Sequence, residues 1–251
     1  MTNKTRRDFL KTSALGLGVM ALGTSAFNSA FGKAMPKGKL NIAVLAATGK
    51  AGRVITLEAL NRGHSITAFV RNADKAKDLA SKGVKIVQKD IFALDGKDLG
   101  GFDVVIDAFG EWKDLSLYKK HGAHLVKILA GNKARLLVVG GAGSLYMDKA
   151  HKVMLVDTPD FPQAHKGVAN AHNEWLGLLR SSKGINWVYV SPPAEFVPDA
   201  TKTGKYKIIG EEFEVNAKGE SKGSYADYAS AMLDIAEDSK VNKVRVGVIG
   251  L

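Results

Sequence analysis

The chain has 251 residues, of which 45% are hydrophobic and 24% are charged, as is typical of a globular protein with one main domain. Its formal net charge of +11 raises the question of a nucleic-acid partner. Residues 1–34 carry +4 of this charge, and the later lysines are scattered among acidic residues without forming basic blocks. We therefore expect a small-molecule partner and no nucleic acid. The chain contains no cysteine, so disulfides, thiolate nucleophiles and cysteine metal sites are excluded.

The first 34 residues have the three-part pattern of an export signal. Arg6 and Arg7 lie in the sequence Thr-Arg-Arg-Asp-Phe-Leu-Lys, which resembles the signal of the twin-arginine export route. An uncharged segment at residues 12–32 follows, with small residues suited to cleavage. We expect residues 1–34 to be a cleaved twin-arginine (Tat) signal peptide, with the export machinery as a partner. The mature protein is then periplasmic and has no membrane span. An uncleaved anchor is the alternative, since a spanning helix needs about 20 residues.

Strands and helices alternate after this segment. Apolar runs predict strands at residues 39–46, 64–70, 84–88, 102–108, 134–139 and 186–190. Helical periodicity and helix-ending glycines predict helices at residues 49–62, 74–81, 117–129 and 164–182. Continuous apolar strands that alternate with helices are typical of a parallel sheet covered on both faces. We therefore predict an α/β fold with a Rossmann-like doubly wound parallel sheet, in a domain spanning residues 38–251.

The C-terminal part breaks this alternation. Residues 205–209 and 212–215 flank a glycine-containing turn and predict a β-hairpin. Ser224, with Asp227 three residues later, predicts the start of a helix, and residues 244–249 predict a terminal strand. We expect a small C-terminal substrate lobe over about residues 192–251.

The end of the first predicted strand has the pattern of a nucleotide-binding turn. Small residues let the backbone approach phosphate groups, which the free N–H groups of a helix N-terminus bind. The spacing follows the usual three-glycine pattern, except that Ala46 stands where the first glycine is expected. A tight turn without a ligand is the alternative. The predicted phosphate-binding residues are Ala47, Thr48, Gly49, Lys50, Ala51 and Gly52.

The residues after the second predicted strand indicate which nucleotide binds. An NAD site usually has an acidic residue there, whereas this chain has Arg71 and Asn72. A guanidinium can pair with a 2′-phosphate through two hydrogen bonds, so we predict NADP(H) in preference to NAD(H). An exposed helix-entry role for Arg71 is the alternative. The other predicted cofactor-binding residues follow later strands: Asp90 on the adenine side, Ala108, Phe109 and Gly110 on the nicotinamide side, and Ser191 and Pro192 in the pocket wall.

Several motifs occur together in an order that resembles the atypical short-chain dehydrogenase/reductases with an NAD(P)-binding domain. The resemblance is to the NADH-flavin reductase group, whose relatives include NmrA-like proteins and biliverdin reductase B-like flavin reductases. It covers residues 39–250 and implies a Rossmann fold and an NAD(P) cofactor, while leaving the substrate open. The matching segments are residues 47–52, 70–72, 139–145, 157–159, 187–192, 203–206 and 224–229.

The catalytic residues of this family are only partly present. Typical short-chain dehydrogenases use Tyr and Lys four residues apart, and none of the six tyrosines here has that partner. Ser144, at the position of the family's serine, and His165, at the start of the next predicted helix, are the candidate catalytic residues. Turn capping by Ser144 and a surface position for His165 are the alternatives.

Two further histidines have a spacing that could chelate a metal. His121 and His124 are three residues apart on a predicted helix. We expect no carboxylate nearby to complete a site, and His121 falls on the apolar stripe of that helix. Core packing is therefore the prediction, with no metal site.

Hydride transfer to a flavin or quinone needs little acid catalysis, because the cofactor supplies the chemistry and the protein supplies positioning. We therefore expect an NAD(P)H-dependent oxidoreductase that reduces a flavin, a quinone or a similar planar acceptor, with flavin as a possible substrate. Trp112 is a candidate for the pocket wall, with core or lid packing as the alternative. The competing classes are a catalytically silent NADP(H)-binding redox sensor and an epimerase or dehydratase.

Overall fold

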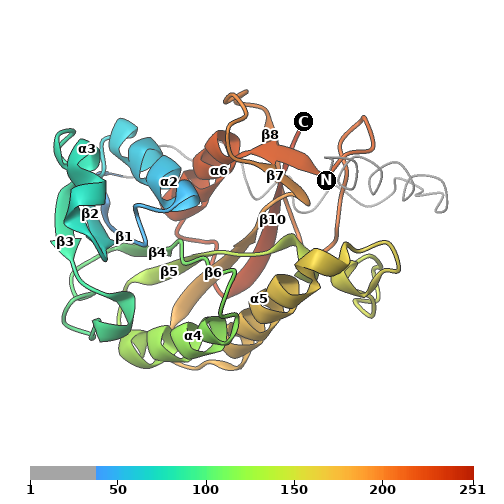
Figure 1. Ribbon diagram of the computed structural model, residues 1–251, viewed down its shortest axis with the longest axis horizontal. Coiled ribbons are helices and arrows are strands. Elements are labelled where there is room, and N and C mark those ends of the chain that lie inside the picture. Colours follow the sequence, from blue (N-terminus) through green and yellow to red (C-terminus); the bar gives the residue numbers. More distant parts are fainter. Residues whose placement is uncertain (1–37) are drawn as a thin grey trace.

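The computed structural model describes residues 38–251, so the predicted signal peptide lies outside the described residues. Within residues 38–251, a single eight-stranded sheet has the order β3-β2-β1-β4-β5-β6-β10-β8 (Figure 1). Seven of its strands are parallel, and only the edge strand β8 is antiparallel. The strands are β1 (Asn41–Leu45), β2 (Ser65–Val70), β3 (Lys85–Gln88), β4 (Val104–Asp107), β5 (Arg135–Val139), β6 (Asn186–Ser191), β8 (Tyr206–Ile209) and β10 (Val244–Gly250).

The helices form two layers, one on each face of this sheet. Figure 1 shows α2, α3 and α6 on one face and α4 and α5 on the other. The α-helices are α2 (Lys50–Asn61), α3 (Lys77–Ala80), α4 (Ser116–Leu129), α5 (Gln163–Ser181) and α6 (Tyr225–Glu237), and the short 3-10 turns are η2 (Ala73–Ala76), η3 (Ile91–Ala93), η4 (Ala142–Ser144) and η5 (Leu155–Asp157). The predicted Rossmann-like doubly wound sheet is thus confirmed. Among residues 38–251, no helix is both long and apolar enough to cross a bilayer.

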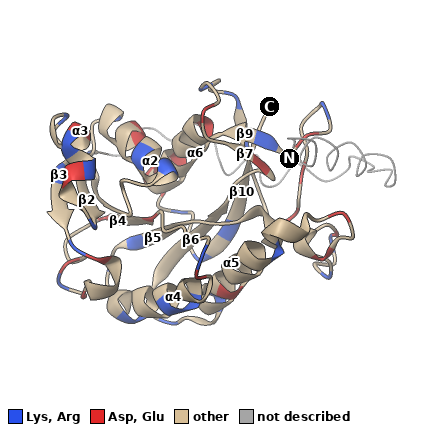
Figure 2. Ribbon diagram, viewed as in Figure 1, with Lys and Arg blue, Asp and Glu red and all other residues tan. Residues whose placement is uncertain are grey.

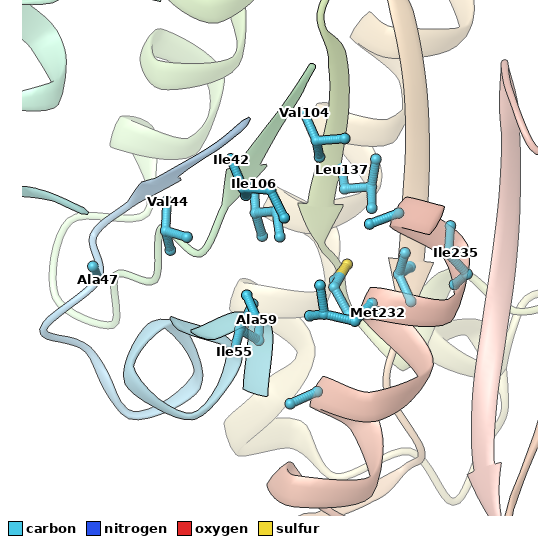
Figure 3. Packing of buried hydrophobic residues seen from close by; sticks show 14 of the residues in the cluster. Ile42, Val44, Ala47, Ile55, Ala59, Val104, Ile106, Leu137, Met232 and Ile235 are labelled. Atoms are coloured by element: carbon cyan, nitrogen blue, oxygen red, sulfur yellow. The ribbon is translucent and has the colours of Figure 1, made fainter. Parts of the chain in front are cut away.

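Alternate residues of each central strand supply two separate apolar cores. Ile42 and Val44 of β1 face the layer of α2 and α6, while Ala43 and Leu45 face the layer of α4 and α5. Figure 3 shows the first core, in which strand side chains meet Ile55 of α2 and others from α6. Since successive side chains of a strand point to opposite faces, a strand buried on both faces must be apolar throughout. This is why the central strands could be located in the sequence.

The C-terminal region corrects one prediction and confirms another. The prediction of a hairpin between residues 205–209 and 212–215 is wrong, because β8 pairs with β10 and residues 212–215 form no strand. The apolar end of β8 is buried within the main sheet, and Glu212 forms only an isolated bridge with Tyr146. The predicted helix start is correct, since the Ser224 side chain accepts a hydrogen bond from the Asp227 N–H.

Two short strands of this region were not predicted. They are β7 (Glu195–Val197) and β9 (Lys222–Ser224), which pair in parallel outside the main sheet. The C-terminal lobe over about residues 192–251 stays a prediction, although its β8 and β10 belong to the main sheet and its α6 packs beside α2 (Figure 1).

Basic and acidic residues are interspersed along the described elements, without a continuous basic stripe in the view of Figure 2. Several are buried in structural roles. The Arg135 guanidinium, for example, donates to the carbonyls of Ile235 at 2.9 Å and Val241 at 2.8 Å, beside the last turn of α6. Ile235 lies in the last turn of α6, where carbonyls lack partners further along the helix, and Val241 follows the helix, so the arginine fixes the end of α6 against β5.

Candidate functional site

The predicted phosphate-binding turn joins β1 to α2. Ala46 has φ of +54°, in the left-handed region that favours glycine. Its carbonyl accepts the Gly49 N–H at 2.9 Å. A Cβ on Gly52 would lie 2.5 Å from the same carbonyl oxygen. Ala46 therefore adopts the left-handed conformation that a glycine would favour at this position, while Gly52 allows the helix to pack closely against the turn.

The first turn of α2 presents free backbone donors at this point. Arg53 donates the first helical hydrogen bond to Gly49, so the amides of Lys50, Ala51 and Gly52 precede the helical ladder. The first turn contains no acidic residue, and Lys50 is exposed there. This combination of helix dipole, free N–H groups and a basic side chain suits a phosphate. Ala47 is buried and Thr48 is half-buried beside it.

The end of β2 carries the residues predicted to select the nucleotide. Arg71 is exposed, and within residues 38–251 its guanidinium has no hydrogen-bonded or ion-paired partner. Asn72 accepts the Asp74 N–H at 2.8 Å and so caps η2. The acidic residues of this segment already have basic partners, because Asp78 pairs with Arg53 and Asp74 pairs with Lys77. The charge of Arg71 therefore remains available to an anion.

Asp90, the residue predicted to reach the adenine, lies after β3. Its carboxylate accepts the Phe92 N–H at 2.8 Å and caps η3. The side chain is exposed, so it keeps a free oxygen for a ligand. Its adenine role stays a prediction.

The end of β4 adjoins the phosphate-binding turn. Strand β4 pairs with β1, and the Ala108 N–H donates to Leu45 at 3.2 Å. This is the point at which the strand order reverses, where doubly wound sheets bind their ligands. Phe109 is half-buried and Gly110 is exposed on the loop that follows. The predicted phosphate and nicotinamide segments therefore lie side by side at the carboxyl edge of the sheet.

A buried carboxylate and imidazole support this loop, and one prediction about them is wrong. The Asp107 Oδ1 atom lies 2.9 Å from His121 Nε2 and accepts the Phe109 N–H at 3.1 Å. Asp107 and His121 are 1% and 0% exposed. A carboxylate thus does lie beside His121, although the core position predicted for this histidine is correct. Among the described residues, no cluster of three or more His, Cys, Asp or Glu side chains could hold a metal ion.

The segment after β5 forms another part of the edge. Ser144 is 3% exposed, and its hydroxyl donates to the Gly141 carbonyl at 3.3 Å. Gly141 in turn donates its N–H to the Tyr189 hydroxyl at 2.9 Å, and that hydroxyl lies 3.2 Å from His172 Nδ1. Burial lowers the pKa of His172 to about 4 and raises that of Tyr189. A neutral His172 can therefore accept a hydrogen bond from the Tyr189 hydroxyl at Nδ1.

The remaining predicted residues lie at the start of α5 and the end of β6. His165 is in the first turn of α5, with its ring centroid 6.0 Å from that of Trp112. Trp112 is 67% exposed, so core packing is wrong for this side chain. Ser191 and Pro192 are buried, and the Ser191 hydroxyl has no hydrogen-bonding partner within the described part of the chain. The catalytic roles of Ser144 and His165 stay predictions.

Sequence reasoning missed three side chains of this edge: Asp107, His172 and Tyr189. Asp107 had a usable signal, because a carboxylate at the end of an otherwise apolar strand needs a buried partner. His172 lies in a helix among ordinary polar residues, and Tyr189 in a buried strand, so neither stood out. Their meeting at Gly141 depends on the packing of α5 against β5 and β6.

Comparison with known proteins agrees with this geometry. Residues 46–239 match the model of a family described as NAD(P)H-binding. The uncharacterised protein YwnB of Bacillus subtilis is 42% identical over 212 residues, which are 84% of this chain and 98% of YwnB. The chain therefore belongs to the NAD(P)H-binding family.

Solved structures resemble the whole described domain. A protein of Streptococcus pneumoniae, provisionally named an NADH-flavin reductase, is 44% identical with a TM-score of 0.80, covering 84% of this chain and 100% of that one. A protein of Burkholderia pseudomallei, provisionally named as exported, is 32% identical with a TM-score of 0.73, covering 84% and 99%. The chain thus has the fold of an NAD(P)H-binding oxidoreductase.

Proposed function

We propose that this protein is an NADPH-dependent reductase that transfers a hydride to a flavin, a quinone or a related planar acceptor. The observation that carries the proposal is the adjacency of the phosphate-binding turn after β1 and the aromatic loop after β4. The first suits a dinucleotide, and the second offers an apolar surface to a flat acceptor. The name of the Streptococcus pneumoniae relative agrees with such a reaction.

The preference for NADPH rests on the end of β2. Arg71 is exposed and uncompensated within residues 38–251, whereas the nearby carboxylates of Asp74 and Asp78 are held by Lys77 and Arg53. A 2′-phosphate would compensate the positive charge of Arg71 through paired hydrogen bonds, while a ribose without this phosphate would leave the charge uncompensated.

The residues of the chain fit the cofactor without a strong general acid. Bound NADPH supplies the hydride. The N–H groups at the start of α2 bind its phosphates, and the loop of Ala108–Gly110 orients the nicotinamide and excludes water. A flavin accepts the hydride at a ring nitrogen and can take its proton from solvent, so Ser144 and His165 assist by orienting the acceptor.

The first test is turnover of NADPH by the purified protein with FMN and with a benzoquinone. We expect oxidation of NADPH to depend on an acceptor. Tight NADPH binding without turnover by any such acceptor would instead favour the catalytically silent alternative. Ser144→Ala and His165→Ala test the side chains separately. If both variants keep the full rate, neither residue is catalytic, even though the reductase assignment stands.

We also propose that the protein works in the periplasm after export by the twin-arginine route. The support is the Arg6-Arg7 motif and the name of the Burkholderia pseudomallei relative. The test is the exported fraction of the double substitution Arg6→Lys and Arg7→Lys. A strong drop is expected, and an unchanged fraction would rule out this route.

A further inference from the structure

Trp112 is the one large aromatic side chain among residues 38–251 that is mostly open to solvent, at 67% exposed. Trp175 and Trp187, by contrast, are 1% and 5% exposed. Tryptophan is highly buried on average, since exposing its ring forgoes a large apolar contact. The exposed indole therefore leaves a large flat apolar surface available to a ligand.

The loop that carries Trp112 is held in place by hydrogen bonds. The Glu111 carboxylate accepts the N–H of Lys113 at 2.6 Å and of Trp112 at 2.8 Å, and these bonds lower the pKa of Glu111. The Glu111 N–H donates to the Tyr118 hydroxyl of α4 at 3.2 Å. The ring is thus presented from a fixed backbone, which reduces the entropy lost when a ligand binds.

The same loop is docked at its far end onto the start of α5. A Cβ on Gly167 would lie 2.9 Å from Leu115 Cδ1, which shows how closely this loop approaches the helix. Trp112 itself meets the His165 ring at an interplanar angle of 75°. An edge-to-face contact of this kind covers only a small part of the indole. The two rings form a corner with most of the indole still open.

This corner lies on the acceptor side of the site. Trp112 follows Phe109 and Gly110 on the connection from β4 to α4, and His165 lies in the first turn of α5. Both elements start at the carboxyl edge of the sheet, beyond the turn expected to bind the cofactor phosphates.

We propose that Trp112 is the stacking platform for the planar ring system of the acceptor, with His165 closing one edge of the corner. This rests on the proposed reductase function and assigns the acceptor class to a defined surface: a fused aromatic ring such as an isoalloxazine. Ring stacking on an indole is tolerant of substituents, so the platform selects flat acceptors over compact aliphatic ketones.

The test separates acceptor binding from cofactor binding. We expect Trp112→Ala to raise the KM for FMN about tenfold, equivalent to about 1.4 kcal/mol. Its kcat and its Kd for NADPH should stay within about twofold of the parent values, because the loop is held by the Glu111 carboxylate and not by the ring. Trp112→Phe keeps a ring and should restore most of the affinity. Val215→Ala, which also trims an exposed apolar side chain, is the control and should change nothing.

A binding measurement keeps this inference distinct from the proposed function. Isothermal titration of FMN into the protein saturated with NADP⁺ needs no turnover. Tight FMN binding that weakens in Trp112→Ala supports the platform even if no reduction follows, in which case only the reductase assignment fails. Turnover with an FMN KM unchanged in Trp112→Ala overturns the platform alone. Equal damage by Trp112→Phe and Trp112→Ala, or no FMN binding at all, also overturns it.

Discussion

The two halves of the carboxyl edge of the sheet differ in the groups that form them. The half formed by the β1–α2 turn consists of backbone groups and small residues, with Ala46 at a φ of +54° and Gly52 against its carbonyl. The half formed by the ends of β4, β5 and β6 depends on side chains, chiefly the Asp107–His121 pair and the His172–Tyr189 pair. Fixed N–H donors suit the phosphates of the proposed cofactor, and side-chain walls suit the proposed acceptor, so we call the two parts the nucleotide half and the acceptor half.

Because the acceptor half depends on buried side chains, the largest expected effect is the loss of stability when one of these side chains is removed. Asp107→Ala leaves the buried His121 ring without its hydrogen-bond partner and frees the Phe109 N–H, so the free energy of unfolding should fall by about 2–4 kcal/mol. Asp103→Ala is the matched control. Asp103 precedes the same strand and accepts the Asn41 N–H at 2.7 Å, but it is exposed, so about 1 kcal/mol is expected. Urea denaturation measures both. Equal losses would show that the Asp107–His121 pair does not hold this half together.

The second prediction concerns pH. Burial lowers the pKa of His172 to about 4 in the folded protein, while its ordinary value is 6.5. Below pH 6.5 the unfolded chain takes up a proton that the folded protein excludes until about pH 4. The contribution of the neutral His172 to the free energy of unfolding should therefore be fully present above pH 6.5. It should fall by at most about 3 kcal/mol as the pH drops to 4. In His172→Asn, whose amide oxygen can replace Nδ1 as an acceptor, this part of the pH dependence should vanish. A parallel pH profile in the variant would contradict the account.

The third prediction uses one substitution at two helical glycines. Gly52→Ala places a methyl group 2.5 Å from the Ala46 carbonyl oxygen, and such overpacking costs about 1–3 kcal/mol. NADPH binding should weaken with it, because the turn must shift. A Cβ on Gly177 of α5 meets nothing within 4 Å. Gly177→Ala should therefore raise stability by up to about 1 kcal/mol and leave NADPH binding unchanged. Thermal unfolding and an NADPH titration of both variants check the pair, and a shared sign of the stability change would refute the close-packing argument.

The β1–α2 turn of the nucleotide half could be predicted from the sequence because its shape depends on the backbone and on small residues. Small residues between a strand and a helix are visible in the sequence, and Arg71 marks the end of the next strand. The parallel sheet could also be predicted from the sequence, since strands buried on both faces are continuously apolar. The phosphate contacts themselves, like the roles of Asp90, Ser191 and Pro192, remain predictions.

The acceptor half was harder to predict from the sequence, because it depends on which helices pack against which strand ends. The contact of Asp107 with His121 joins the end of β4 to the middle of α4, and local spacing does not reveal it. The predicted hairpin failed for a similar reason. The apolar residues of β8 gain more by joining β10 at the sheet edge than by pairing with residues 212–215, where Glu212 and Glu214 bind His151 and Lys207.

The most direct test of the central claim is a pair of fluorescence titrations with NADPH and NADH, on the parent protein and on Arg71→Ala. The account predicts tighter binding of NADPH by the parent. A guanidinium–phosphate contact contributes about 1.5–3 kcal/mol, so Arg71→Ala should weaken NADPH binding by tenfold or more and leave NADH binding nearly unchanged. Equal affinities for the two nucleotides would contradict the role of Arg71. Failure to bind either would mean that the turn at residues 46–52 is structural only, and the reductase proposal would fall with it.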